Sequence, residues 1–150
     1  MGNSFKKIMI TTDGSVNTKN SIESGLELAR QTGASVYAAY VVSTDFYSSI
    51  ATDIGWETMY ESLKKEGRTA LKFVVDAGKE VGVPVEAIML EGHPVPEIIN
   101  FAEKEGMDLV IMGTHGRTGL DKLLLGSVAE NVVSHCKVPV MVVRSEEKVE

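Results

Sequence analysis

The sequence predicts an α/β fold built on a single open parallel sheet of five strands, with helices on both faces. Short runs of apolar, often β-branched residues alternate with longer segments whose apolar residues recur at helical spacing. Glycine or proline stands at most of the boundaries between them. The chain has 150 residues, 43% hydrophobic and 24% charged, which is ordinary for one globular domain. We therefore expect one domain over 1–150, with its core within about 7–144.

The first half of the chain alternates two strands with two helices. Ser15 or Asn17 can cap the first helix, and Gly33 and Gly82 can end the two helices. The expected elements are a strand over 7–12, a helix to about 32, a strand over 35–42 and a long helix over about 56–81. The buried stripes of these helices are expected to be Ile22, Gly25, Leu26 and Ala29, then Met59, Leu63, Ala70, Leu71, Val74 and Val81.

The second half continues the same alternation. Pro94 or Pro96 suits the first turn of a helix, which Gly106 then ends. The expected elements are strands over 84–90, 108–112 and 138–143, and helices over about 94–105 and 127–135. The expected apolar stripes are Val95, Ile98, Ile99 and Ala102, then Val128, Val132 and Val133.

Segment 43–55 has no apolar period, and loops of this length in compact domains are usually functional or mobile. The remaining order, strand and helix in strict alternation, implies a parallel sheet with right-handed crossovers. In such sheets ligands bind beyond the carboxyl ends of the strands, where the strand order reverses. If the order is 3-2-1-4-5, that point lies between Asp13 and Gly113, which end the first and fourth strands.

A glycine-rich loop follows the fourth strand and is the strongest chemical signal in the chain. It reads Gly113-Thr114-His115-Gly116-Arg117-Thr118-Gly119, and Gly126-Ser127 stands before the next helix. Its glycines allow positive φ and close approach of a ligand, and Ser127 is expected to be the N-cap of the helix. Backbone amides at a helix start suit a phosphate group.

A nucleotide would place its phosphates over this loop. We expect phosphate contacts from Gly113 to Gly116, from the amides of Gly126, Ser127 and Val128, and from Arg117. Asp13 could accept from ribose hydroxyls or hold Mg²⁺, the main chain at Val41 could bind the adenine edge, and Met112 could touch the base. These residues can also be explained without a ligand. The glycines and the Asp13-Gly14 pair can be ordinary turn residues, His115 can be a solvated turn residue, and Arg117 can be a surface charge.

Several function classes are disfavoured. The net charge of −6 argues against a nucleic-acid partner, and the single cysteine, Cys136, allows no internal disulfide or cysteine-based zinc site. Neither a signal-peptide core nor an apolar run of membrane-spanning length is visible, so a cytoplasmic protein is expected. The P-loop, dinucleotide-binding and nucleophile-elbow motifs are absent. A phospho-acceptor receiver domain would need clustered acidic residues and an Asp at the end of the third strand, where Glu91-Gly92 stands.

The motif Gly113-x-x-Gly116, nine residues, then Gly126-Ser127 resembles the ATP-binding signature of the universal stress protein family. The segments 8–15, 92–94 and 138–143 fit the same resemblance, which covers about residues 7–144. It implies a Rossmann-like, adenine nucleotide alpha hydrolase-like fold with strand order 3-2-1-4-5 and a homodimer formed through strand 138–143. It implies a nucleotide site of Thr12, Asp13, Val41, Met112, Gly113, His115, Gly116, Arg117, Gly126, Ser127 and Val128. Ala129 departs from relatives that carry Ser or Thr there, which removes one phosphate contact.

Three hypotheses about function stay open on the sequence. The first is a stress-response regulator that binds ATP and Mg²⁺ with little hydrolysis, because no general base is evident. The second is a slow ATPase or phosphotransferase in which Asp13 holds the metal. The third is a nucleotide-independent dimeric scaffold that binds a protein partner through segment 43–55.

Overall fold

One five-stranded parallel sheet forms the centre of the molecule, as the computed structural model shows for residues 5–44, 54–115 and 125–145. The strand order is β3-β2-β1-β4-β5, and every pairing between neighbours is parallel. The strands are β1 (Lys7–Thr11), β2 (Ser35–Ser43), β3 (Val85–Gly92), β4 (Leu109–Gly113) and β5 (Val140–Val143). The predicted fold class and strand order are thus confirmed.

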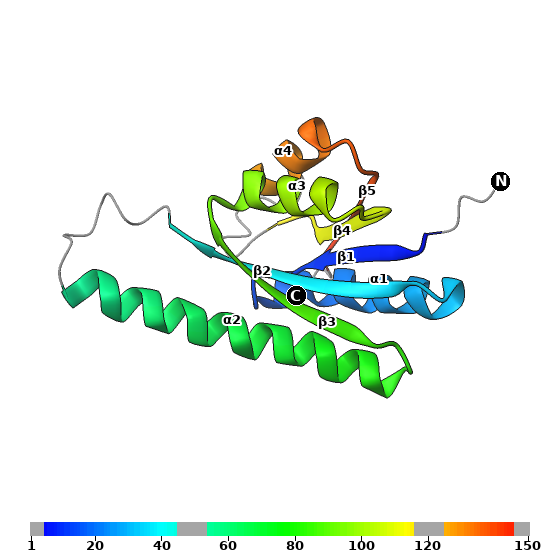
Figure 1. Cartoon of the computed structure of the whole chain (residues 1–150), viewed down its shortest axis with the longest axis horizontal. Coiled ribbons are helices and arrows are strands. Elements are labelled where there is room, and N and C mark those ends of the chain that lie inside the picture. Colours follow the sequence, from blue (N-terminus) through cyan, green and yellow to red (C-terminus); the bar gives the residue numbers. More distant parts are fainter. Residues whose placement is uncertain (1–4, 45–53, 116–124, 146–150) are drawn as a thin grey trace, which may run out of the picture.

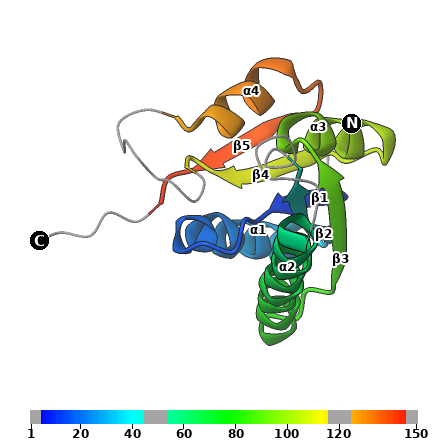
Figure 2. The same ribbon diagram turned by 90° about the vertical axis from the view of Figure 1, so that its left-hand side faces the viewer.

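Two helices cover each face of the sheet (Figures 1 and 2). Those on one face are α1 (Lys19–Thr32), preceded by the 3₁₀ turn η1 (Val16–Thr18), and α2 (Ile54–Glu80). Those on the opposite face are α3 (Pro94–Lys104) and α4 (Ser127–His135). This arrangement follows from right-handed crossovers that leave the central strand in opposite directions.

The sheet therefore has a buried apolar cluster on each side. The cluster beneath α1 and α2 includes Ile8, Ile10, Leu26, Val36, Leu71, Val74 and Ile111. The cluster beneath α3 and α4 includes Met9, Ile98, Ala102, Val110, Met112, Ala129 and Val132. Ile8, Met9 and Ile10 of β1 face opposite clusters in turn and are all buried, which explains why the centre of this strand is a continuous apolar run.

The predicted helix boundaries hold with small shifts. The Ser15 side chain caps η1 by accepting from the Asn17 amide at 3.2 Å, and Gly33 ends α1 in the left-handed region at φ 75°. The prediction of a buried position is wrong for two residues, Val81 and Val133. Val81 follows the last residue of α2 and is 42% exposed; Val133 is 44% exposed because Ala129 and Val132 form the buried face of α4.

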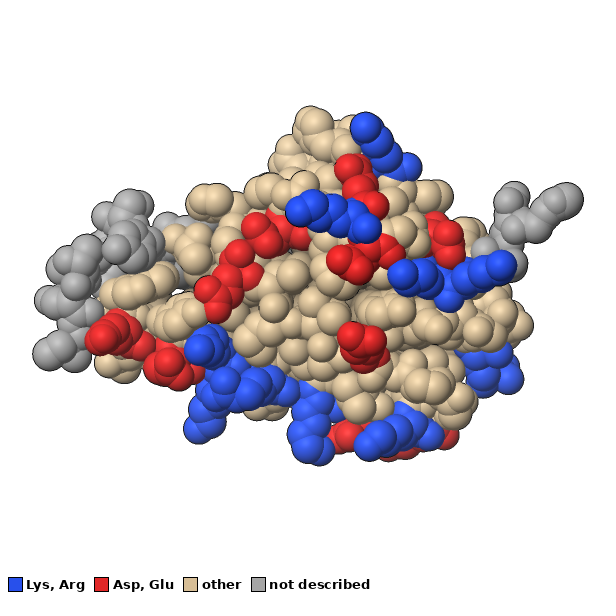
Figure 3. Space-filling model, in the orientation of Figure 1, with Lys and Arg blue, Asp and Glu red and all other residues tan. Residues whose placement is uncertain are grey.

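Acidic and basic side chains are interspersed on the face shown in Figure 3, with uncharged surface between them. Within the ranges given above, no helix combines the length and apolar character that crossing a bilayer would require.

Candidate functional site

A notch in the carboxyl edge of the sheet arises because the central strand stops early. The pairing of β1 with β2 ends at Thr11 and Ala39, whereas β2 runs on to Ser43 beside β3. The pairing of β1 with β4 ends at Ile111, whereas β4 continues to Gly113 beside β5. The two neighbours therefore extend past β1 on both sides and leave a crevice at the predicted point of strand reversal.

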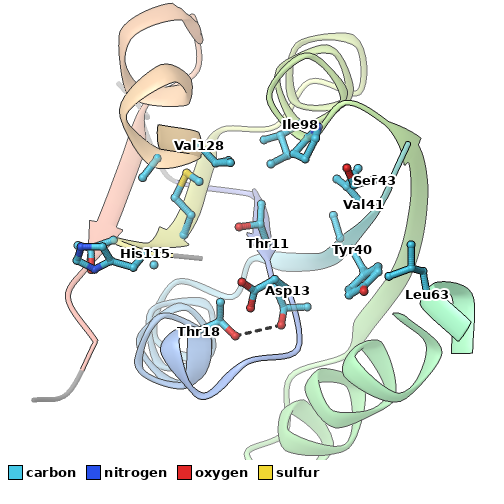
Figure 4. Close-up of a pocket in the computed structure, with 17 residues that line it drawn as sticks. Thr11, Asp13, Thr18, Tyr40, Val41, Ser43, Leu63, Ile98, His115 and Val128 are labelled. Carbon is cyan, nitrogen blue, oxygen red and sulfur yellow. Dashed lines mark hydrogen bonds between the residues drawn. The ribbon is translucent and has the colours of Figure 1, made fainter. Parts of the chain in front are cut away.

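This crevice has a volume of about 290 Å³ and is mainly apolar (Figure 4). Asp13 lies in its centre, with Val41 and Ser43 on one side and Val128 on the other. Its lining brings together seven of the residues predicted for a nucleotide site: Thr12, Asp13, Val41, Met112, Gly113, His115 and Val128. Residues from β1, β2, β4 and α4 thus meet in one place, although they are far apart in sequence.

The backbone of Val41 faces the part of the notch that β1 leaves open. The Ala39 carbonyl accepts from the Thr12 amide at 3.0 Å, so it points towards β1. Because strand residues alternate with period two, the amide and carbonyl of Val41 point to the same side, beyond the end of β1. A donor and an acceptor from one residue, side by side, match the pattern on the edge of an adenine ring.

Asp13 is held by the turn that follows β1. Its Oδ1 accepts from the Ser15 amide at 2.9 Å and from the Ser15 hydroxyl at 2.7 Å, and Gly14 has φ 82°. The Asp13-Gly14 pair is thus an ordinary turn, as the explanation without a ligand supposed, but the turn also places the carboxylate in the crevice. A turn role for Asp13-Gly14 and a ligand-binding role for the Asp13 carboxylate are therefore compatible.

Thr18 is a pocket residue that the sequence analysis missed. Its hydroxyl lies 3.1 Å from the hydroxyl of Thr12 and also donates to the Ser15 carbonyl at 2.9 Å. Thr18 is 6% exposed and ends η1. A buried threonine just before a helix is a weak signal, because capping alone accounts for that residue type.

The apolar wall opposite α4 was also missed. It is formed by Tyr40 of β2 and by Leu63 of α2, and the sequence placed Leu63 only in a helical core stripe. The first turns of α2 are fixed beside β3 because the Tyr60 hydroxyl donates to the Glu91 carboxylate, and this bond raises the pKa of Tyr60. Helical periodicity identified Leu63 as inward-facing, but it could not distinguish a core from a cavity wall.

The two loop glycines that the structure describes, Gly113 and Gly126, do not adopt the positive φ that the sequence suggested. Gly126 has φ −64°. A Cβ on Gly113 would lie 3.0 Å from the Asn17 carbonyl oxygen, so glycine there lets β4 approach η1 closely. The Gly126 amide donates to the Thr114 carbonyl at 2.7 Å. Gly116 and Arg117 lie outside the described residues.

The predicted N-cap of α4 is shifted by one residue. Gly126 is the N-cap, without a side-chain hydrogen bond, and Ser127 is the first residue of the helix. Ser127 is exposed and Gly126 half-buried, and neither lines the crevice, whereas Val128 does. The amides of Ser127 and Val128 stand in the first turn of α4, where no helical acceptor is available. An anion near this helix start would find donors there.

His115 is buried and is not a solvated turn residue. It is 7% exposed, and its Nδ1 lies 3.0 Å from the Thr114 hydroxyl. Its Nε2 is buried with no hydrogen-bond partner among the residues described. A buried nitrogen without a partner is costly, and a ligand in the crevice that His115 lines would be one way to satisfy it.

A metal ion in the crevice would need most of its ligands from groups other than the described protein side chains. Among the described residues, no three His, Cys, Asp or Glu side chains are grouped as metal ligands. Asp13 could supply one oxygen, and Mg²⁺ usually takes most of its ligands from phosphates and water. The donor set therefore fits a metal that arrives with a phosphate ligand and does not fit an all-protein metal cage.

Comparison with known proteins identifies the family. The model of the universal stress protein family matches residues 4–144. The chain belongs to this family. Universal stress protein MJ0531 of Methanocaldococcus jannaschii is 44% identical over 146 residues, which cover 97% of this chain and 86% of that protein.

Solved structures agree with the fold. The structure of MJ0577, also from Methanocaldococcus jannaschii, has a TM-score of 0.84 and 29% identity, covering 97% of this chain and all of that one. A universal stress protein in complex with cAMP has a TM-score of 0.73 and 21% identity, covering 96% of this chain and 100% of that chain. The family resemblance seen in the sequence is confirmed.

Proposed function

We propose that this universal stress protein binds ATP, together with Mg²⁺, in the crevice left by the early end of β1. The observation that carries the proposal is the convergence of Asp13, Val41, Met112 and Val128 on that crevice. A solved member of the family holds an adenine nucleotide, cAMP, which supports the same class of ligand here.

Each part of the nucleotide has residues suited to it. The amide and carbonyl of Val41 would bind the adenine edge, and Met112 would pack against the ring. Asp13 would accept from the ribose hydroxyls or ligate Mg²⁺. The phosphates would extend towards the first turn of α4 and segment 116–124, where Arg117 and Gly116 stand in the sequence. Three or four charge-assisted hydrogen bonds at about 1.5–3 kcal/mol each would give the roughly 8 kcal/mol of a micromolar complex.

Binding with little hydrolysis is the mode that the described residues favour. Asp13 is the one carboxylate that lines the crevice among them, and its Oδ1 accepts two hydrogen bonds from Ser15. Those bonds occupy Oδ1 and hold the carboxylate in the turn, so it is not free to swing towards a water molecule beside the phosphates. We therefore propose a regulatory role in the stress response, in the cytoplasm, for a protein that retains its nucleotide.

A substitution in α4 tests the proposal with a matched control. Val128→Trp fills the crevice, whereas Val133→Trp places the same side chain on the exposed face of the same helix. Titration calorimetry of the parent with Mg-ATP should give a dissociation constant of about micromolar order. We expect Val128→Trp to weaken binding at least about tenfold and Val133→Trp to leave it unchanged.

Two results would contradict the proposal in different ways. Absence of binding by the parent would favour the nucleotide-independent scaffold, in which segment 43–55 contacts a protein partner. Phosphate release above a buffer blank that Asp13→Asn abolishes would instead favour the slow ATPase or phosphotransferase.

We also propose a homodimer formed through β5. This strand is at the edge of the sheet and pairs with β4 on one side, and Met141 on it is 37% exposed. An exposed apolar edge strand promotes association, and pairing with a second copy would cover it.

A further inference from the structure

A second hollow lies between the η1–α1 segment and α2, on the face of the sheet that these two helices share (Figures 1 and 2). Its volume is about 710 Å³, compared with about 290 Å³ for the crevice. Small-molecule sites typically measure about 300–1,000 Å³. It touches the crevice at Thr12, Asp13 and Thr18 but is otherwise lined by different residues.

Exposed apolar side chains form part of its wall. Val16 is 81% exposed and Phe73 is 52% exposed, and both line this hollow. Single exposed apolar residues are common on proteins, but two that line one concave site indicate a binding surface. Ile22 and Ala70, which are buried, line it between them.

The hollow extends along α2. Along α2 it is lined by the polar residues Ser62, Lys65, Glu66 and Thr69 and then by the apolar residues Ala70 and Phe73. The helical rise of 1.5 Å per residue gives roughly 16 Å between the first and last of these positions. α1 runs in the same direction as α2 (Figure 1).

The facing wall is also mixed in character. Along the chain, the apolar Val16 follows Asp13 and Ser15, and the apolar Ile22 follows Thr18 and Lys19. Both walls therefore carry apolar side chains next to polar ones.

Lysines stand on the rim of the hollow. Lys19 and Lys65 both line it and both are exposed. Of the two acidic residues in the lining, Asp13 is held by Ser15 at the crevice end, and Glu66 is exposed beside Lys65 on α2. A single anionic group on a ligand could therefore reach either ammonium group while its apolar part stays between the helices.

We propose that this hollow binds a straight-chain amphiphile of the fatty-acid class. The aliphatic chain lies against Val16, Ile22, Ala70 and Phe73, and the carboxylate lies at the rim near Lys19 and Lys65. A mostly apolar site that extends roughly 16 Å along α2 and has ammonium groups on its rim matches this chain length and charge. The proposal does not depend on nucleotide binding, because the groups that contact the ligand are separate from those assigned to ATP, and the shared wall residues are not needed for it.

Displacement of a fluorescent fatty acid tests the proposal. The delipidated full chain, without nucleotide, is titrated with cis-parinaric acid, and myristic acid, hexanoic acid and myristyl alcohol are then used as competitors. We expect saturable binding, displacement by myristic acid, and at least about tenfold weaker competition by hexanoic acid, which buries less apolar surface.

Matched variants locate the site. Val16→Ser and Phe73→Ser should each weaken binding about tenfold, whereas Val133→Ser, on the far face of the sheet, should not. Lys65→Gln should weaken binding of myristic acid more than that of myristyl alcohol, and Lys79→Gln on the same helix should affect neither. Thermal unfolding confirms that each variant is folded, which we expect because every changed side chain is either charged or at least 44% exposed.

Three outcomes would overturn the proposal. The first is no saturable binding by the parent, and the second is binding that Val16→Ser and Phe73→Ser leave unchanged. The third is another occupant: displacement of the probe by an amphipathic helical peptide but not by myristic acid, or a dimer that Val16→Ser dissociates in sedimentation velocity.

Discussion

The hydroxyls of Thr12 and Thr18 lie 3.1 Å apart in the buried wall of the crevice, and this contact joins the end of β1 to the last residue of η1. The Gly14 amide also donates to the Thr12 hydroxyl at 3.0 Å. The turn that carries Asp13 is therefore closed at both of its ends by threonine side chains. The position of the Asp13 carboxylate depends on this small network.

Thr18→Val should lower both stability and ATP affinity. The change keeps the volume but leaves the buried Thr12 hydroxyl without this partner and loosens the Asp13 turn. We expect a loss of about 1–3 kcal/mol in the free energy of unfolding, measured by urea denaturation, and weaker Mg-ATP binding in calorimetry. Thr32→Val is the control, because its hydroxyl donates to the Leu28 carbonyl on an exposed part of α1. Equal affinities for parent and Thr18→Val would contradict the role given to this network.

Alanine substitutions at two glycines of α2 should distinguish an effect on stability from an effect on ATP binding. A Cβ on Gly78 would lie 2.5 Å from the Val83 carbonyl oxygen, which is backbone and cannot easily move. A Cβ on Gly67 would lie 2.7 Å from Cδ1 of Tyr40, a wall residue of the crevice. Gly78→Ala should cost about 1–3 kcal/mol of unfolding free energy while the folded protein keeps its ATP affinity.

Gly67→Ala should lower ATP affinity as well as stability, because the new methyl group displaces the Tyr40 ring. Calorimetry at a temperature where both variants are folded makes the comparison. If Gly78→Ala weakens binding as much as Gly67→Ala does, the effect comes from general loosening of α2 and not from Tyr40.

His115→Phe should affect binding more than folding. The Nε2 atom of His115 is buried without a partner among the residues described, so removing it takes away an unfavourable feature, which offsets the lost Nδ1 contact with Thr114. We expect the melting temperature to change little and Mg-ATP affinity to fall about tenfold, as expected for one lost charge-assisted hydrogen bond. His135→Phe, on the exposed end of α4, serves as control. A large loss of stability with unchanged affinity would assign His115 a structural role.

Met141→Lys should dissociate the proposed dimer. The substitution places a positive charge on the exposed edge strand β5, where it would oppose pairing with the same strand of a second copy. Light scattering after gel filtration should give the mass of a dimer for the parent and of a monomer for the variant. Val133→Lys adds the same charge on α4 and should leave the mass unchanged. A parent that is monomeric at all concentrations would exclude the β5 interface.

The sequence by itself determined the fold class, the order of elements and most of the buried residues. It could do so because alternation of apolar runs with helical stripes is a local pattern, as in Ile8 to Ile10 of β1 and Ile22, Leu26 and Ala29 of α1. The spaced glycines also identified the family, and Asp13 and Val41 were placed on the correct edge because parallel strands share one carboxyl end.

Only the tertiary structure decided how the site is built. The early end of β1 beside its longer neighbours creates the crevice, and strand register cannot be read from one strand alone. Tyr40, Leu63 and Thr18 become wall residues through contacts between distant elements, and the close approach of η1 explains Gly113 without a ligand. The same holds for the hollow between α1 and α2, which exists because two helices that share one face of the sheet leave space between the start of α1 and the middle of α2.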